Sequence, residues 1–159
     1  MSSIGHGNAR NRRRLNNLIR DSLREVSSQL SLLNHRVSSQ LGIKDADYDC
    51  LDLIGRHGPL SPSALAKRAG LHPATITGIL DRLERAGWVT RERDPADRRA
   101  VLVHARRDRS AEIFHLYTGM NSAMDELISG YTEGELAVLA DFLQRTAAAG
   151  KTATDELAD

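Results

Sequence analysis

The chain has 159 residues, enough for one domain with a substantial core and too few for two domains of ordinary size. Hydrophobic residues make up 40% of it and aromatic residues only 4%, so the core must be aliphatic, and no apolar run approaches the roughly 20 residues of a membrane span. A single cysteine excludes an internal disulfide, and no signal-peptide apolar region follows the first basic residues, so we expect a cytoplasmic protein with no membrane partner.

Charge is unevenly distributed, although the net charge is only +1. Residues 1–55 carry a net charge of +2, residues 56–107 carry +6, and residues 108–159 carry −7. A basic middle segment between neutral and acidic flanks attracts phosphate to one face and repels it elsewhere. This pattern favours a nucleic-acid partner, with a solvated surface patch as the alternative.

The N-terminal part of the chain predicts a short tail followed by a long helix. Residues 1–9 are small, polar and glycine-containing, so we expect a disordered tail. Apolar residues then recur every three or four positions over residues 10–42, and Gly42 supplies a helix stop. The rest of the chain cannot cover so long a stripe, so we predict a dimerisation helix; an amphipathic helix folded back on its own domain is the alternative.

Residues 45–106 predict a lobe that contains a helix-turn-helix. A first short helix is expected over residues 45–57. Ser61 followed by Pro62 is a typical helix start, because serine can accept the free amide hydrogens of the first turn and proline lacks one. A glycine-containing turn ends that second helix, and Pro73 opens a third. Two short helices joined in this way form a helix-turn-helix, whose second helix can enter a major groove.

The next stretch predicts a β-hairpin, or wing. Residues 88–93 and 100–104 are rich in β-branched residues and alternate in polarity, and the Asp-Pro and charged residues between them are typical of a turn. An arginine at such a tip can enter a narrow minor groove. We expect Asp94 and Asp97 to pair with the wing arginines and fix the shape of the loop. A surface hairpin with exposed ion pairs is the alternative.

Two further helices are predicted after the hairpin. The first covers residues 107–129, and the second begins at a capping box, Thr132 to Glu135, and ends near residue 148. Residues 107–148 are therefore predicted as C-terminal dimerisation helices, and residues 149–159 as a frayed tail. The expected fold is mainly α with a small β-hairpin wing: one structural domain in which a winged helix-turn-helix lobe joins long N- and C-terminal helices.

The outward face of the second helix of the helix-turn-helix is the strongest candidate site. Thr75, Thr77 and Gly78 are poor helix formers with no packing reason to cluster, and small or hydroxyl-bearing residues permit close approach to base edges. We expect contacts with double-stranded DNA from this helix, the helix before it and the wing. These candidates are Ser61, Ser63, His72, Pro73, Ala74, Thr75, Thr77, Gly78, Arg82, Arg91, Arg93, Asp97, Arg98 and Arg99.

Several stretches match one known pattern. They are Leu60-Ser61, Leu65-Ala66, Thr75-Ile76-Thr77, Leu80-Asp81-Arg82-Leu83-Glu84, Gly87-Trp88-Val89, Arg91 and Asp97-Arg98-Arg99. With them the chain resembles the MarR family of bacterial regulators. The resemblance implies a triangular homodimer with the terminal helices at its interface, Arg98 in the minor groove, and Thr75 and Thr77 in the major groove. His72 stands where Ser or Asp is common, so we expect a less firmly fixed start of the reading helix.

The predicted function is that of a sequence-specific DNA-binding transcriptional regulator. We expect a repressor that binds a pseudo-palindromic operator as a homodimer and that a small-molecule effector releases. Two alternatives remain: a winged-helix protein-interaction module, and a non-specific nucleoid-associated DNA-binding protein.

Other kinds of site have little support in the sequence. The six histidines lack metal-ligand spacing, so we expect no metal and no cofactor. A nucleophile elbow, a phosphate loop and paired catalytic carboxylates are all missing, so an enzyme is not expected. Cys50 is predicted to be a buried core thiol rather than a redox sensor. His35 and Tyr48 are weak candidates for effector binding, because relatives bind small phenolic or anionic ligands between the dimer helices and the lobe; both could equally be core residues.

Overall fold

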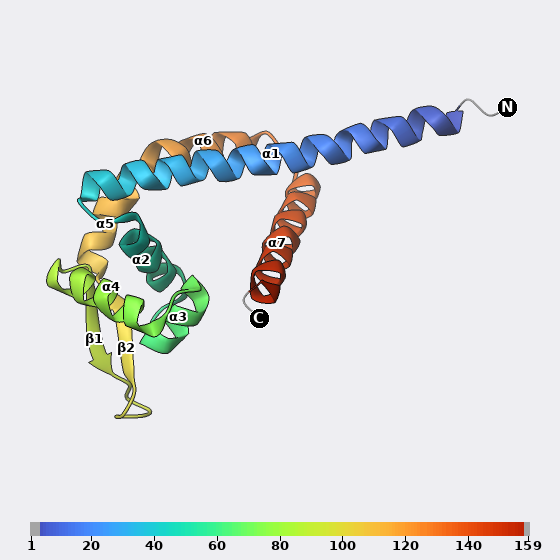
Figure 1. The fold of residues 1–159 in the computed structure, drawn as a ribbon. Coiled ribbons are helices and arrows are strands. Elements are labelled where there is room, and N and C mark those ends of the chain that lie inside the picture. Colours follow the sequence, from blue (N-terminus) through green and yellow to red (C-terminus); the bar gives the residue numbers. More distant parts are fainter. Residues whose placement is uncertain (1–3, 158–159) are drawn as a thin grey trace. The chain divides into compact units, whose positions relative to one another are not determined.

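The computed structural model describes residues 4–157, which form seven helices and one β-hairpin (Figure 1). The elements are α1 (Ile4–Leu41), α2 (Asp45–His57), α3 (Pro62–Ala69), α4 (Pro73–Arg85), β1 (Val89–Arg93), β2 (Val101–Ala105), α5 (Arg107–Leu116), α6 (Thr118–Ser129) and α7 (Glu133–Glu156). The predicted mainly α fold with a small hairpin wing is confirmed. The chain divides into two compact units, one up to Tyr48 and one from Asp49 onward. Within the described residues, every helix is too short or too polar to cross a membrane.

The first unit is dominated by α1, a single helix of 38 residues. It ends at Gly42, whose φ of 67° lies in the left-handed region that favours glycine, as the sequence predicted. The helix begins earlier than expected, so residues 4–9 are helical and the predicted disordered tail is wrong there; residues 1–3 lie outside the described residues. Extending an existing helix adds one hydrogen bond for each residue ordered, which offsets the low helix propensity of the glycines in this stretch.

The core of the second unit is formed by buried side chains of α2, α3, α4 and the hairpin. Its side chains are mainly aliphatic, as the composition required, and α4 contributes four of the largest because its apolar residues recur at helical spacing. The largest fully buried side chains in this unit belong to Ile54, Leu65, Ile76, Ile79, Leu80, Leu83, Val89 and Val103. Burial on this scale holds α4 against α3 and β1.

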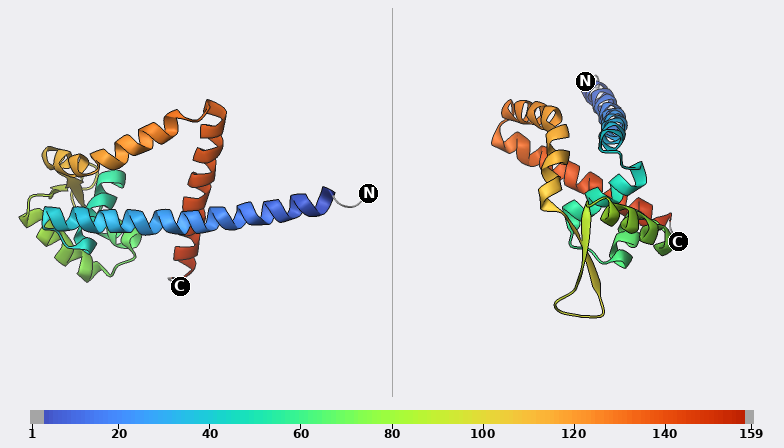
Figure 2. Two further views of the ribbon diagram at one scale, coloured as in Figure 1. Left: turned by 90° about the horizontal axis from the view of Figure 1, so that it is seen from above. Right: turned by 90° about the vertical axis from the view of Figure 1, so that its left-hand side faces the viewer.

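The hairpin is anchored at its base and free at its tip. Strands β1 and β2 pair antiparallel, with Val89 opposite Ala105 and Arg93 opposite Val101. Leu60, just before α3, forms an isolated bridge to Val103 through backbone hydrogen bonds of 3.1 and 2.8 Å. The hairpin therefore starts from a fixed base and projects away from the helices of its unit (Figure 2).

The helix predicted over residues 107–129 is interrupted. Tyr117, with φ −93° and ψ 1°, separates α5 from α6, and its N–H bonds to the Phe114 carbonyl at 3.1 Å, a tighter turn than that of an α-helix. The next residues, Thr118 and Gly119, both have low helix propensity, which explains why the break falls here.

The capping box predicted at the start of α7 is confirmed. The Thr132 hydroxyl accepts a hydrogen bond from the Glu135 N–H at 3.4 Å, and the Glu135 carboxylate accepts one from the Thr132 N–H at 2.9 Å. These bonds to Thr132 lower the pKa of Glu135. The helix continues to Glu156, so residues 149–156 are helical rather than frayed; a Lys151–Asp155 ion pair, one turn apart, supports the added turns.

Candidate nucleic-acid interface

The two helices of the helix-turn-helix are both capped at their starts. Ser61 has an extended backbone, and its hydroxyl accepts the Ala64 N–H at 3.1 Å. At the start of α4, the Nδ1 atom of His72 accepts the Ala74 N–H at 3.2 Å. A ring nitrogen therefore supplies the cap, although His72 was expected to leave this helix start less firmly fixed.

The outward side of α4 carries small and hydroxyl-bearing residues. Ala74, Thr75 and Thr77 are exposed and Gly78 is partly exposed, and we call these four residues the reading face. The Thr77 hydroxyl donates to the Pro73 carbonyl at 3.1 Å, which leaves its oxygen able to accept from another donor. Such a surface lets the helix backbone come close to base edges in a major groove.

Arg91 of β1 is bound to two carboxylates of α4. Its Nη2 lies 2.6 Å from Asp81, and its Nε lies 3.5 Å from Glu84. The Arg91 side chain is only 28% exposed. This arginine therefore fixes the first strand of the hairpin to the reading helix, a role that differs from the DNA contact expected of it.

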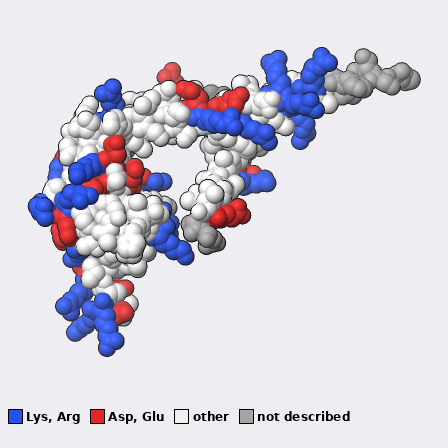
Figure 3. Space-filling view, viewed as in Figure 1, with Lys and Arg blue, Asp and Glu red and all other residues white. Residues whose placement is uncertain are grey.

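The tip of the hairpin is basic. Arg93, Arg98 and Arg99 are exposed, and basic side chains gather at the end of the hairpin (Figure 3). A hairpin tip of this charge can reach a groove with strongly negative potential.

The two tip carboxylates bind backbone rather than arginine side chains. Asp97 accepts the Arg99 N–H at 2.9 Å, and Asp94 accepts the Ala96 N–H at 2.8 Å. The predicted pairing with arginine side chains is therefore wrong, because a short carboxylate reaches the amide two residues onward more readily than a guanidinium. Both residues still fix the shape of the loop, as expected, and leave the arginine side chains of the tip exposed.

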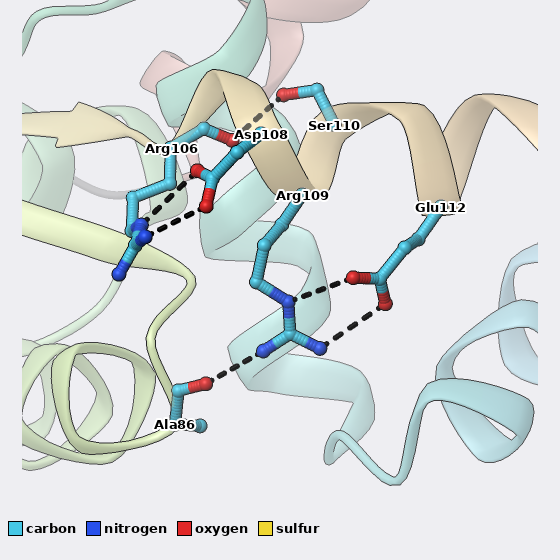
Figure 4. Close-up of polar contacts among 6 residues, drawn as sticks. All are labelled: Ala86, Arg106, Asp108, Arg109, Ser110 and Glu112. Carbon is cyan, nitrogen blue, oxygen red and sulfur yellow. Dashed lines mark hydrogen bonds and ion pairs between the residues drawn. The ribbon is translucent and has the colours of Figure 1, made fainter.

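A polar cluster that the sequence did not predict joins the start of α5 to the C-terminal end of α4 (Figure 4). Arg109 of α5 donates to the Ala86 carbonyl at 2.7 Å and to both Glu112 oxygens at 3.1 Å, and it lies 3.6 Å from the centroid of the Trp88 ring. The Arg109 hydrogen bond lowers the pKa of Glu112. The spacing of Arg109 and Glu112 indicates an ion pair on one helix, but the contact with Ala86 joins residues 23 positions apart and depends on the fold.

The same helix start carries a second ion pair. Arg106 donates to both oxygens of Asp108, at 3.1 and 2.7 Å. This pairing lowers the pKa of Asp108 and raises that of Arg106. Arg106 and Arg109 are thus both held by carboxylates of their own helix.

The effector candidates lie in the first unit. His35 Nδ1 lies 2.7 Å from Asp45, whose other carboxylate oxygen contacts the Ser38 hydroxyl. Hydrogen bonds to Ser38 and His35 lower the pKa of Asp45. Tyr48 is buried, with an exposed fraction of 3%.

Cys50 is fully buried, which confirms the predicted core thiol. Among the residues that the structure describes, no cluster of three or more potential metal ligands is present.

Known transcriptional regulators are similar to this chain over both the winged lobe and the helices that flank it. A sequence model of the MarR family matches residues 43–101. The chain is 31% identical over 124 residues to the HTH-type transcriptional regulator YcgE of Bacillus subtilis, covering 78% of this chain and 80% of YcgE. It is 27% identical over 130 residues to the HTH-type transcriptional repressor YetL of the same organism, covering 78% of each chain.

Solved structures share the fold. The crystal structure of Streptococcus pneumoniae FabT in complex with DNA matches with a TM-score of 0.61 and 21% identity, covering 86% of this chain and 97% of FabT. The match extends well beyond the helix-turn-helix, so the helices on either side of the lobe belong to the shared architecture.

Proposed function

Since this chain belongs to the MarR family of DNA-binding transcriptional regulators, we propose that it represses transcription as a homodimer on a pseudo-palindromic operator. The observation that carries the proposal is the reading face of α4, which stands on the same lobe as the basic hairpin tip. The name of YetL, a repressor, supports the direction of regulation. The comparisons favour this function over a protein-interaction module.

We assign the DNA contacts by residue type and position. Thr75 and Thr77, with Ala74 and Gly78 beside them, read base edges in the major groove. Arg98 enters the minor groove. The remaining contacts are to sugar and phosphate, and come from Ser61, Ser63, His72, Pro73, Arg82, Arg93 and Arg99. Arg91 and Asp97, bound within the lobe, support the hairpin rather than the DNA.

The homodimer is supported by apolar side chains that this chain leaves uncovered. No residue of α5, α6 or α7 is buried, and these helices expose large hydrophobic residues, as does α1. The most exposed are Leu18, Val26 and Leu32 on α1, and Phe114, Leu127, Val138 and Leu143 on the C-terminal helices. Soluble chains rarely leave so much apolar surface open, and a second copy is the simplest cover.

Members of this group of regulators can respond to small molecules, and His35 and Tyr48 are the candidate residues for such a response in this chain. We propose that an effector binds the dimer in the cytoplasm, that the protein acts by binding rather than by catalysis, and that His35 and Tyr48 are the first residues to test. A panel of phenolic and anionic compounds should raise the melting temperature of the parent chain. A compound whose effect is unchanged in His35→Ala and Tyr48→Phe would remove both residues from the proposal.

Selection of bound duplexes from a random library, with the full chain, tests the function. The expected product is a pseudo-palindrome with half-site centres about 10 bp apart, because two symmetric reading helices span one turn of DNA. The selected duplex should bind at least about 10³-fold more tightly than a scrambled duplex of equal length. Equal affinity for both duplexes would instead mean non-specific binding, and an absence of enrichment would contradict the proposal altogether.

A further inference from the structure

We propose that Arg109 is a positioning residue for DNA reading: from α5, its guanidinium holds the C-terminal end of α4 and so sets the angle of the reading face. The inference rests on the DNA-binding function proposed above. Arg109 belongs to none of the predicted DNA contacts, and it lies at the opposite end of α4 from the reading face.

The first observation is that the Arg109 guanidinium joins two helices, because it binds the C-terminal end of α4 and a carboxylate of α5. Ala86 is the C-terminal cap of α4, and helices leave their last carbonyls without a partner in the helix itself. Arg109 donates to the Ala86 carbonyl at 2.7 Å, a short distance typical of a charge-assisted hydrogen bond. Its Nε and Nη2 atoms donate to the Glu112 carboxylate, so a residue of its own helix fixes the orientation of the guanidinium.

The second observation concerns Trp88, the residue beneath the guanidinium. Trp88 is 3% exposed, and its backbone N–H donates to the Leu83 carbonyl at 2.9 Å, in the last turns of α4. Its own carbonyl accepts the Arg106 N–H at 2.9 Å, at the start of α5. Trp88 therefore cannot shift without moving α4 or α5, and Arg109 lies 3.6 Å over its ring.

The third observation is the close approach at Gly87. A Cβ atom there would lie 3.8 Å from Arg106 Nη1 and 4.0 Å from Arg109 Nη1, so both guanidiniums face the chain where it leaves α4. Positive charge at a helix C-terminus is favourable, because the carbonyl dipoles point toward it. Arg106 is bound to Asp108, whereas Arg109 forms a direct hydrogen bond to a carbonyl at the end of α4.

Because α4 is long, a small change of angle at its C-terminal end displaces the reading face by a large distance. Ala86 and Thr75 are 11 residues apart, about 16 Å along a helix. A tilt of about 5° at Ala86 would displace Thr75 by roughly 1.4 Å. Hydrogen bonds to base edges do not survive a displacement of that size. Since α5 leads on to α6 and α7, a change in the position of α5 would reach the reading face through Arg109.

Arg109→Met in the full chain tests the proposal, with Arg107→Met as the matched control. Arg107 lies on the same helix, is exposed, and forms no side-chain hydrogen bond or ion pair within residues 4–157. The probe is the duplex selected from the random library. Arg109→Met should bind it about tenfold more weakly, while Arg107→Met should bind as the parent does. Arg109→Lys keeps the charge but loses the planar guanidinium that can bind Ala86 and Glu112 together, so it should recover part of the affinity.

Two further readouts separate positioning from other roles. A residue that touches no phosphate should leave the slope of log Kd against log salt unchanged when it is replaced, whereas loss of a phosphate contact lowers that slope by about one. Trp88 is the only tryptophan of the chain, so its emission should change in Arg109→Met and not in Arg107→Met. If Arg109→Met fails to fold, Glu112→Gln, which releases the guanidinium of Arg109, should give a smaller loss of affinity at unchanged salt slope.

Four results would overturn the proposal. They are parent-like affinity of Arg109→Met, a salt slope reduced by about one, an equal loss in Arg107→Met, and, where Arg109→Met does not fold, parent-like affinity of Glu112→Gln. Failure of the proposed function itself is distinguishable, because the parent chain would then not bind the selected duplex more tightly than its scrambled control.

Discussion

The winged lobe buries its apolar side chains, whereas the helices that follow it leave many of theirs exposed. On α4, Ile76, Leu80 and Leu83 are each 1% exposed. On α5 and α6, Phe114 is 67% exposed and Leu127 is 62% exposed. The lobe therefore completes its own core within one chain, whereas the C-terminal helices keep an apolar face that requires another surface. Under the proposed function, DNA reading and dimer assembly therefore belong to different parts of the molecule.

The largest expected effect comes from opening a cavity in the lobe. Leu80→Ala should lower the free energy of unfolding by about 2–5 kcal/mol, because the surrounding core cannot collapse fully around the lost atoms. Urea denaturation measures this loss. Leu139→Ala on α7, where the side chain is 41% exposed, should cost much less in the same assay at low protein concentration. Equal losses at the two positions would remove the distinction between the regions.

The next largest effect concerns the C-terminal helices. Leu127→Glu places a charge on the exposed apolar face of α6 and should raise the dimer dissociation constant about 100-fold, because a charge is costly to bury at an interface. Sedimentation velocity at several concentrations measures the change. Glu126→Gln, at the adjacent position, should leave the dimer intact. A monomeric parent chain, or a fully dimeric Leu127→Glu variant, would contradict the assignment of α6 to the interface.

A smaller effect is expected at the hairpin tip. Arg98→Ala should weaken binding of the selected duplex about tenfold, since a single groove contact contributes about 1–3 kcal/mol. Fluorescence anisotropy measures the affinity, and sedimentation should show an unchanged dimer. Arg145→Ala on α7 removes the same charge outside the lobe and should bind as the parent does. Parent-like binding by Arg98→Ala would remove the hairpin tip from the interface with DNA.

The smallest effect is one of pH, at the junction between the two regions. Arg109 lowers the pKa of Glu112, so the pair is intact above the ordinary glutamate pKa of about 4.3 and is lost as pH falls through the lowered value. Trp88 emission should therefore change in this acid range. Glu112→Gln should lack that change, while Glu126→Gln keeps it. An identical change of emission in Glu112→Gln would show that Trp88 does not respond to the Arg109–Glu112 pair. The energy involved is small, because the pair is exposed.

Local signals in the sequence predicted the order of elements well. The Ser61–Pro62 start, the Gly42 stop and the capping box of α7 depend on residues within about four positions of one another, so the sequence alone determines them. Helix ends without such signals were missed. The start of α1 at Ile4 and the end of α7 at Glu156 depend on helix extension, which no single residue type marks.

In the candidate site too, features set by the local sequence were predicted, and contacts between different elements were not. The helical period alone placed Thr75 and Thr77 on the outward side of α4, and the structure agrees. The Arg91–Asp81 and Arg109–Ala86 contacts join residues 10 and 23 positions apart, on different elements, so they follow from tertiary packing. Asp97 was assigned the wrong partner because the sequence does not indicate whether a carboxylate meets a side chain or a nearby amide.

We infer that the winged lobe, whose core is complete within one chain, reads DNA only as half of a two-fold assembly. The mass of the complex between the full chain and the selected duplex, measured by sedimentation equilibrium, tests this inference. We expect two chains on each duplex, bound together without a populated intermediate of one chain. A stable complex of one chain with one duplex, at full affinity, would contradict it.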